Sequence, residues 1–140
     1  MKILTSAELA ILVETAVPVR ELHVETSNSD EWSKTMFKLI ERGTLKVLRL
    51  ENKYLPHGPG SHAKYISEAL LPALNEHCEL EDLRIDNCVL IPTDEFWLSY
   101  MKSLKSLVFV DCDYISWNPQ LSGTLQEALP NCSIESKITF

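Results

Sequence analysis

The sequence lacks any apolar run that approaches the roughly 20 residues needed to span a bilayer. Its start, MKILTSAELAILVETA, is interrupted by Glu8 and Glu14, and no small-residue cleavage site follows, so it does not fit a secretory signal. The same two acids, and the absence of Arg before Arg20, argue against a mitochondrial presequence. We therefore expect a protein of the cytoplasm or nucleus with no membrane partner.

Positive charge is also scarce. Its 13 Lys and Arg residues are scattered among 20 Asp and Glu residues, which gives a formal net charge of -7. Because an acidic surface repels phosphate backbones, we expect no nucleic-acid partner. The 140 residues suit a single domain, and the 45% hydrophobic content is ordinary for a globular protein.

Catalytic and metal-binding motifs are missing as well. The chain contains no G-x-S-x-G, no Walker-type loop and no H-E-x-x-H. HGPGSH, at 57–62, combines two His with a Ser, but nothing orients the Ser and we interpret the stretch as a flexible connector. His77 and Cys78 with Cys88 form the nearest metal-binding cluster, without a C-x-x-C pair. We predict no enzymatic activity, no cofactor and no metal.

What the chain does contain is a repeat. Three nine-residue stretches, at 45–53, 80–88 and 104–112, carry Leu at their first and fourth positions and an apolar residue at the sixth. Two weaker copies start at 19 and 129, so the starts 19, 45, 80, 104 and 129 are separated by steps of 26, 35, 24 and 25. The L-x-L alternation is typical of a half-buried strand. Since one strand cannot bury its apolar face alone, we expect the copies to stack in parallel, joined by helices.

The period and the pattern L-x-x-L-x-L-x-x-N/C resemble the leucine-rich repeat family over nearly the whole chain. Cys at the ninth position, in Cys88 and Cys112, resembles the cysteine-containing repeats of F-box-type and ribonuclease-inhibitor-like proteins. This implies one α/β domain over 1–140, a right-handed solenoid of about five parallel strands with outer helices. We assign the long step of 35 to a loop in NKYLPHGPGSH, at 52–62, which holds two Pro and two Gly.

The spacers between the repeats predict the helices. Apolar stripes indicate helices at 30–42, 61–76, 93–103 and 122–128. Pro72 is expected to kink or split the second, Thr93 to cap the third, and Trp32 and Trp97 to lie in the core. TSAE, a capping-box pattern, opens a helix at 5–15, and we expect residues 1–18 to close one end of the stack.

The strand positions that do not face the core line the expected concave face. Their fifth positions are His23, Arg49, Arg84, Val108 and Ser133; their seventh are Glu25, Glu51, Asp86, Val110 and Glu135; their third are Glu21, Val47, Asp82, Ser106 and Asn131. This pattern sets a basic row between acidic rows and then an apolar patch at Val108 and Val110. The charges either neutralise one another across strands or form a partner-binding surface in which the arginines hold a carboxylate.

Cysteines and loop aromatics leave further alternatives. We favour four reduced thiols over two disulfides, with Cys88 and Cys112 pointing into the turns after their strands and hydrogen-bonding to the backbone. Tyr114 and Trp117, in the loop after the fourth strand, either anchor a partner or pack under that loop.

We therefore predict a protein–protein interaction module. The expected partner-binding residues are Glu21, His23, Glu25, Arg49, Glu51, Arg84, Asp86, Val108, Val110, Tyr114 and Trp117. The family resemblance implies substrate recognition in an F-box-type ubiquitin ligase. LPNCSI, near the end, is also similar to the closing repeat of small mitochondrial leucine-rich-repeat assembly factors for respiratory complexes, and an enzyme is the third alternative. An unpaired end strand after Leu129 predicts either a monomer or an edge-strand dimer.

Overall fold

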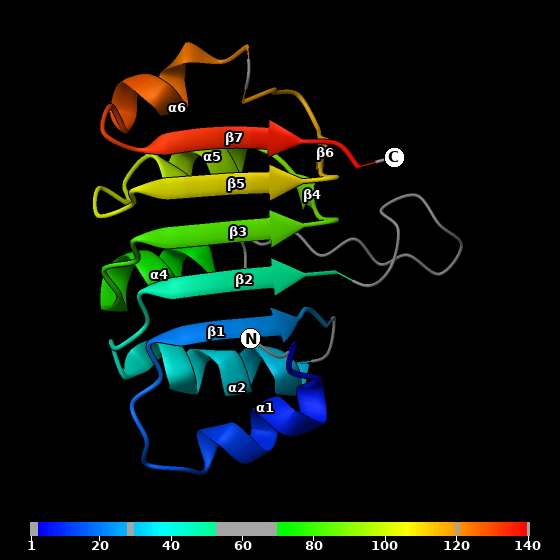
Figure 1. Cartoon of the computed structure of the whole chain (residues 1–140), viewed down its shortest axis with the longest axis vertical. Coiled ribbons are helices and arrows are strands. Elements are labelled where there is room, and N and C mark those ends of the chain that lie inside the picture. The colour runs from blue at the N-terminus through cyan, green and yellow to red at the C-terminus, as the bar shows by residue number, and fades with distance from the viewer. Residues whose placement is uncertain (1–2, 28–29, 53–69, 120, 140) are drawn as a thin grey trace.

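Five parallel strands form one sheet in the computed structural model, which describes residues 3–27, 30–52, 70–119 and 121–139 (Figure 1). The strand order is β1-β2-β3-β5-β7. These strands are β1 Glu21–Glu25, β2 Val47–Glu51, β3 Asp82–Asp86, β5 Ser106–Val110 and β7 Ser133–Lys137. A second, two-stranded parallel sheet joins β4 Val89–Leu90 to β6 Asp113–Tyr114. The predicted α/β class and the five parallel strands are confirmed.

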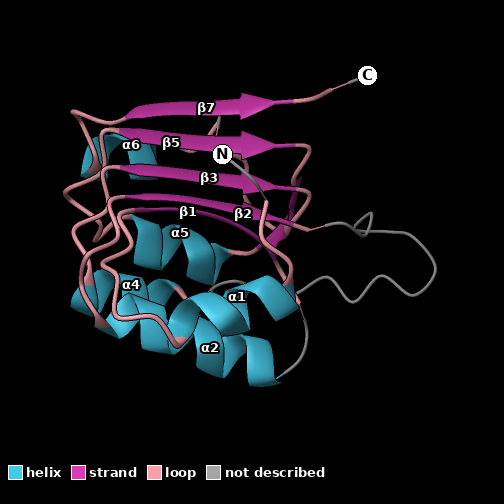
Figure 2. Cartoon of the chain, turned by 60° about the horizontal axis from the view of Figure 1, so that its bottom comes forward, coloured by secondary structure: helices cyan, strands magenta, loops and turns pink. Residues whose placement is uncertain are grey.

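Helices cover one side of the large sheet, as Figure 2 shows. They are α1 Ser6–Val13, α2 Asp30–Glu41, α4 Leu71–His77, α5 Pro92–Leu98 and α6 Gly123–Ala128. None of the helices in the described ranges is long and apolar enough to cross a membrane. The core lies between this layer and the sheet, where Leu48, Leu83 and Leu107 are buried. Trp32 is buried in the same core and Trp97 packs partly buried against it, as predicted.

The strand register follows the repeat over its first four copies. Leu22, Leu48, Leu83 and Leu107, the fourth positions of those copies, lie side by side on β1, β2, β3 and β5. The fifth copy is shifted by two residues, because Ile134 pairs with Leu107. Leu129 and Cys132 are buried ahead of the strand, where the Cys132 N–H donates to the Leu129 carbonyl at 3.1 Å and turns the chain.

The turns after β3 and β5 use the same position of the repeat. Asn87 and Asp111 follow their strands directly and adopt left-handed conformations, with φ of 57° and 52°. Asn and Asp tolerate this region better than other residues with a side chain. The Cys at the next position therefore turns back toward the end of its strand.

Most helix boundaries agree with the sequence. Thr5 and Glu8 form the predicted capping box of α1, and α2 ends just before Gly43, whose φ is 71°. Pro72 lies in the first turn of α4, which starts at Leu71. The rest of the helix predicted at 61–76, and the loop and HGPGSH connector predicted before it, lie largely outside the described residues.

The helix predicted at 93–103 differs from α5. Thr93 does not cap it, because the helix starts earlier, at Pro92, and the Asp94 carboxylate accepts the Ile91 N–H at 2.8 Å. After Leu98 the chain leaves the helix through turns, in which the Met101 N–H donates to the Leu98 carbonyl at 3.0 Å. Proline fits the first turn of a helix because it has no N–H to lose there.

Candidate functional site

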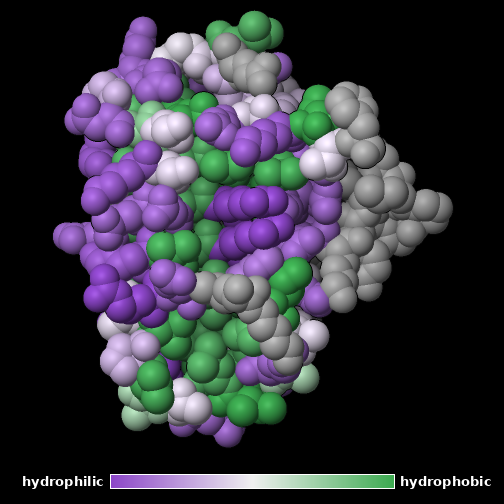
Figure 3. Space-filling model, viewed as in Figure 1, coloured by the Kyte–Doolittle hydropathy of each residue, from purple (hydrophilic) through white to green (hydrophobic). Residues whose placement is uncertain are grey.

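The side of the large sheet that faces away from the helices forms a polar surface. We call it the open face and define it by the side chains at the third, fifth and seventh positions of the repeats. Hydrophilic groups gather over the middle of this side, with hydrophobic groups between them (Figure 3). The side chains that make up the open face are Glu21, His23, Glu25, Val47, Arg49, Glu51, Asp82, Arg84, Asp86, Ser106, Val108, Val110, Ser133, Glu135 and Lys137.

Asp86 is the last residue of β3, the middle strand of the open face, and it is only 5% exposed and binds two arginines. Arg84 donates from Nε to Oδ1 at 2.9 Å and from Nη2 to Oδ2 at 3.2 Å. Arg49, on the neighbouring strand, donates from Nη2 to Oδ2 at 2.8 Å. The Asp86 carboxylate holds the pKa of the Arg84 guanidinium above its usual range. A buried acid thus fixes two cations in place.

His23 and Glu51 form a second polar pair on the open face. His23 Nε2 lies 3.1 Å from Glu51 Oε2, and His23 is itself 7% exposed. Together with the Asp86 contacts, this pair matches the interpretation in which charges neutralise one another across strands. Arg49 and Arg84 stay half-buried, so their outer surfaces remain accessible. The two interpretations coexist, and contact with a partner stays a prediction.

The predicted apolar patch is smaller than expected. Val110 is buried among its cross-strand neighbours Asp86 and Lys137, whereas Val108 is half-buried and lies between Arg84 and Glu135. The patch prediction is therefore corrected to Val108, because Val110 is only 5% exposed.

The last strand brings different residues to the open face than the sequence predicted. Because of the two-residue shift, Glu135 takes the fifth position and Lys137 the seventh, in place of Ser133 and Glu135. Ser133 takes the third position instead of Asn131. Lys137 Nζ lies 3.2 Å from Glu135 Oε2, and both side chains are more than half exposed.

At the first strand, Glu21 is exposed and Glu25 half-buried, so this edge of the open face is acidic. Val47, between Glu21 and Asp82 in the register, is half-buried. Across the open face, the side chains thus change from acids on β1 to the arginines on β2 and β3 and then to Val108 on β5.

Tyr114 and Trp117 pack beneath their loop. Both rings contact Phe109 edge-on, with centroids 6.0 Å and 6.2 Å away, and they contact each other at 5.6 Å. The Tyr114 hydroxyl lies 2.6 Å from Ser136 Oγ, and burial raises the Tyr114 pKa to about 12. These contacts match the alternative of packing under the loop, and any contact with a partner is limited to the half-exposed edges of the rings.

The cysteines are free thiols that bond to the backbone. Cys112 Sγ donates to the Ile85 carbonyl at 3.3 Å, and Cys88 Sγ donates to the Asp86 carbonyl at 3.5 Å, as predicted for these turns. Burial raises the pKa of the Cys112 thiol to about 11 and that of Cys88 well above its usual range. Such thiols are poor nucleophiles at neutral pH.

In the described part of the chain, no group of three or more His, Cys, Asp or Glu residues is placed so that it could hold a metal ion. Cys78, from the nearest candidate cluster, instead donates to the Ile40 carbonyl at 3.3 Å.

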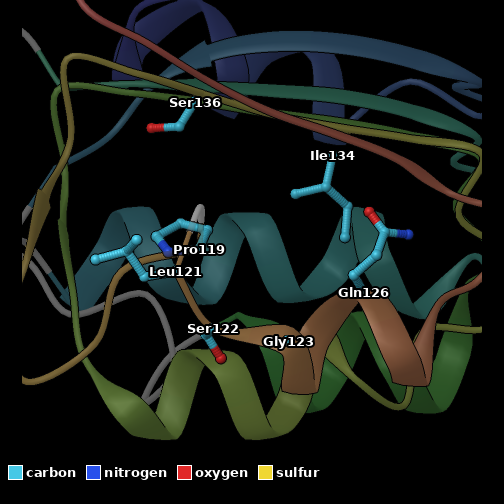
Figure 4. A pocket seen from close by; sticks show the side chains of 7 residues that line it. All are labelled: Pro119, Leu121, Ser122, Gly123, Gln126, Ile134 and Ser136. Atoms are coloured by element: carbon cyan, nitrogen blue, oxygen red, sulfur yellow. The ribbon is translucent and has the colours of Figure 1, made fainter.

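Sequence reasoning missed a cleft at the end of the sheet beyond β7. It measures about 420 Å³ and lies between β7 and α6 (Figure 4). Its lining residues are Pro119, Leu121, Ser122, Gly123, Gln126, Ile134 and Ser136. Leu121, 85% exposed, was the available signal, since it is an apolar residue outside every repeat position.

The chain matches no family model, no curated protein and no solved structure. A proposal about function therefore rests on the residues of the open face themselves.

Proposed function

We propose that the chain is a leucine-rich-repeat solenoid whose open face binds a segment of another protein. Five parallel strands in register, with leucines aligned across β1 to β5, support the solenoid part of the proposal. Each crossover between these strands is taken as right-handed, the hand that strand–crossover–strand connections prefer. The proposal assigns binding to this protein and no catalysis.

The observation that carries the binding proposal is the pair of half-exposed arginines fixed by buried Asp86. A guanidinium has five N–H donors, and Asp86 takes one from Arg49 and two from Arg84. The Arg49 Nε–H is buried, and the other remaining donors are already oriented, so binding a partner loses less entropy in ordering them. Planar guanidiniums recognise carboxylates, and the matching partner group is therefore an Asp or Glu side chain.

The surroundings of the arginines define the rest of the partner. Glu21 and Glu25 at the β1 edge favour basic residues on one flank of the bound segment, whereas half-buried Val108 favours an apolar residue on the other. The proposed ligand is a segment of mixed charge with a central acid, and its source is the substrate of an F-box-type ubiquitin ligase.

A single charge removal on the open face tests the proposal. Arg84→Gln removes one guanidinium while Arg49 still pairs with Asp86, so the fold is kept. Reversing both arginines would instead surround the buried carboxylate with acids and unfold the site. We expect Arg84→Gln to weaken capture of the partner from a lysate about tenfold or more.

Lys34→Gln is the matched control, because Lys34 is exposed on α2, on the helical side, and the variant loses the same charge. It should capture the same proteins as the wild type. Cullin-ligase components among proteins lost with Arg84→Gln support the ligase role. If the proteins lost with Arg84→Gln are respiratory-complex subunits, they support an assembly role and not the ligase role. Equal capture by Arg84→Gln and Lys34→Gln would rule out the open face as the binding surface.

A further inference from the structure

The outer edge of β7 carries the strongest inference beyond the open face. β7 ends the five-stranded sheet and pairs with β5 alone among the described strands. The opposite edge differs, because Leu4 bridges to Val24 and covers β1. An exposed strand edge is a template for another strand.

In β7, the backbone N–H and C=O groups of the odd-numbered residues point toward β5. The Ser133 N–H donates to the Lys105 carbonyl at 2.9 Å, and the Lys137 carbonyl accepts the Asp111 N–H at 2.8 Å. Beyond the strand, the Thr139 N–H donates to the Asp111 side chain, at Oδ1, at 2.6 Å. The chain therefore stays beside the end of β5 just after Lys137.

The backbone N–H and C=O groups of the even-numbered residues must then point outward, away from β5, because these groups alternate between the two edges of a strand from one residue to the next. Cys132 agrees, since its carbonyl accepts from Gln126 Nε2 of α6 at 3.2 Å, and not from a backbone N–H of β5. Ile134 and Ile138 are the next outward residues, and Ile138 is 73% exposed.

This parity limits how two copies of β7 can pair. Outward residues must lie opposite outward residues, so only registers that match even numbers with even numbers form hydrogen bonds. A register centred on residue 135 places Glu135 against itself, and one centred on 137 places Lys137 against itself. A register centred on 136 places Glu135 opposite Lys137 twice and Ile134 opposite Ile138 twice. Like charges directly opposite are destabilising and unlike charges stabilising.

We propose that two copies of this chain associate through antiparallel pairing of their β7 edges, in the register centred on residue 136. The self-complementary charges of Glu135 and Lys137 select a second copy over an unrelated strand. Ile134, which pairs with Ile138 of the second copy in this register, lines the cleft between β7 and α6 together with exposed Leu121 (Figure 4). The two-fold axis is perpendicular to the sheet, so both open faces stay accessible on one side.

A charge swap tests this association with the full chain by sedimentation equilibrium from micromolar to millimolar concentration. The wild type should dimerise. Lys137→Glu places Glu135 against an acid at both contacts, and it should raise the dimer dissociation constant about tenfold. The double variant Glu135→Lys with Lys137→Glu restores both attractive contacts and should restore dimerisation. Because both side chains are exposed, circular dichroism should be the same for all three proteins.

Three results would overturn the proposal. They are a wild type that stays monomeric at millimolar concentration, a dimer that Lys137→Glu does not weaken, and a double variant that stays as weak as Lys137→Glu. The proposed function fails separately, through the Arg84→Gln capture experiment, because neither charge on β7 contacts the arginines.

Discussion

Arg49 on β2 donates to Asp86 on β3 across 2.8 Å, from the fifth position of one repeat to the seventh position of the next. The contact is diagonal across the register, and it joins a half-exposed cation to an almost fully buried anion. Asp86 thereby links two strands through side chains as well as through the backbone. Its burial makes the carboxylate a structural element of the open face rather than a free contact for a partner.

Asp86→Ala should therefore destabilise the protein. Two guanidiniums would remain close together without their shared acid, at a cost of about 2–4 kcal/mol in the free energy of unfolding. Asp82→Ala is the matched control, because Asp82 is exposed on the same strand, and its effect should stay within about 0.5 kcal/mol. Urea unfolding measures both, and equal midpoints for the two variants would contradict the structural role of Asp86.

Gly43 ends α2 in a conformation that a side chain resists. Its φ is 71°, and an added Cβ would lie 3.0 Å from the His77 carbonyl oxygen. Gly43→Ala should cost about 1–3 kcal/mol in the free energy of unfolding. Gly123→Ala, where the nearest atom lies 3.8 Å away at the start of α6, should leave stability unchanged or raise it by about 0.4–1 kcal/mol. Thermal unfolding compares them, and a neutral Gly43→Ala would contradict this account.

The sequence predicts the fold because each repeat places its apolar residues with strand periodicity. Leu48, Leu83 and Leu107 pair as that pattern requires. The last repeat breaks the pattern because LPNCSI holds apolar residues both in the turn and in the strand. Spacing alone cannot say whether Cys132 or Ile134 lies opposite Leu107, whereas in the structure the backbone turns between Leu129 and Cys132 and Ile134 takes that place.

The candidate site could be predicted less well. The sequence indicates which residues share the open face, since strand alternation fixes the side on which each lies. It does not indicate that Asp86 and Val110 are buried there. Such burial depends on side-chain contacts within and between strands, such as the hydrogen bonds from Arg84 and Arg49 to Asp86. The packing of Tyr114 and Trp117 against Phe109 likewise depends on the course of a loop that has no periodicity.

The leucines at the fourth positions should dominate stability. Leu83 is almost fully buried between two neighbouring strands, so Leu83→Ala leaves a cavity and should cost about 2–5 kcal/mol in the free energy of unfolding. Ile11→Ala, at an exposed position of α1, should change stability by less than about 0.5 kcal/mol. Denaturant titration of both variants checks the difference, and similar losses would place Leu83 outside the cooperative core.

Cys112 should make stability fall in alkaline solution. Burial raises the pKa of its thiol from an ordinary 9.0 to about 11, so the unfolded chain loses this proton first. The contribution of Cys112 to the free energy of unfolding is then complete below pH 9 and is lost as the pH rises to about 11. Cys112→Ala should lose less stability over this range than the wild type, whereas Val108→Ala, which removes no titrating group, should keep the wild-type slope. Urea unfolding at several pH values measures these slopes, and parallel curves for Cys112→Ala and the wild type would mean that the thiol titrates as it does in water.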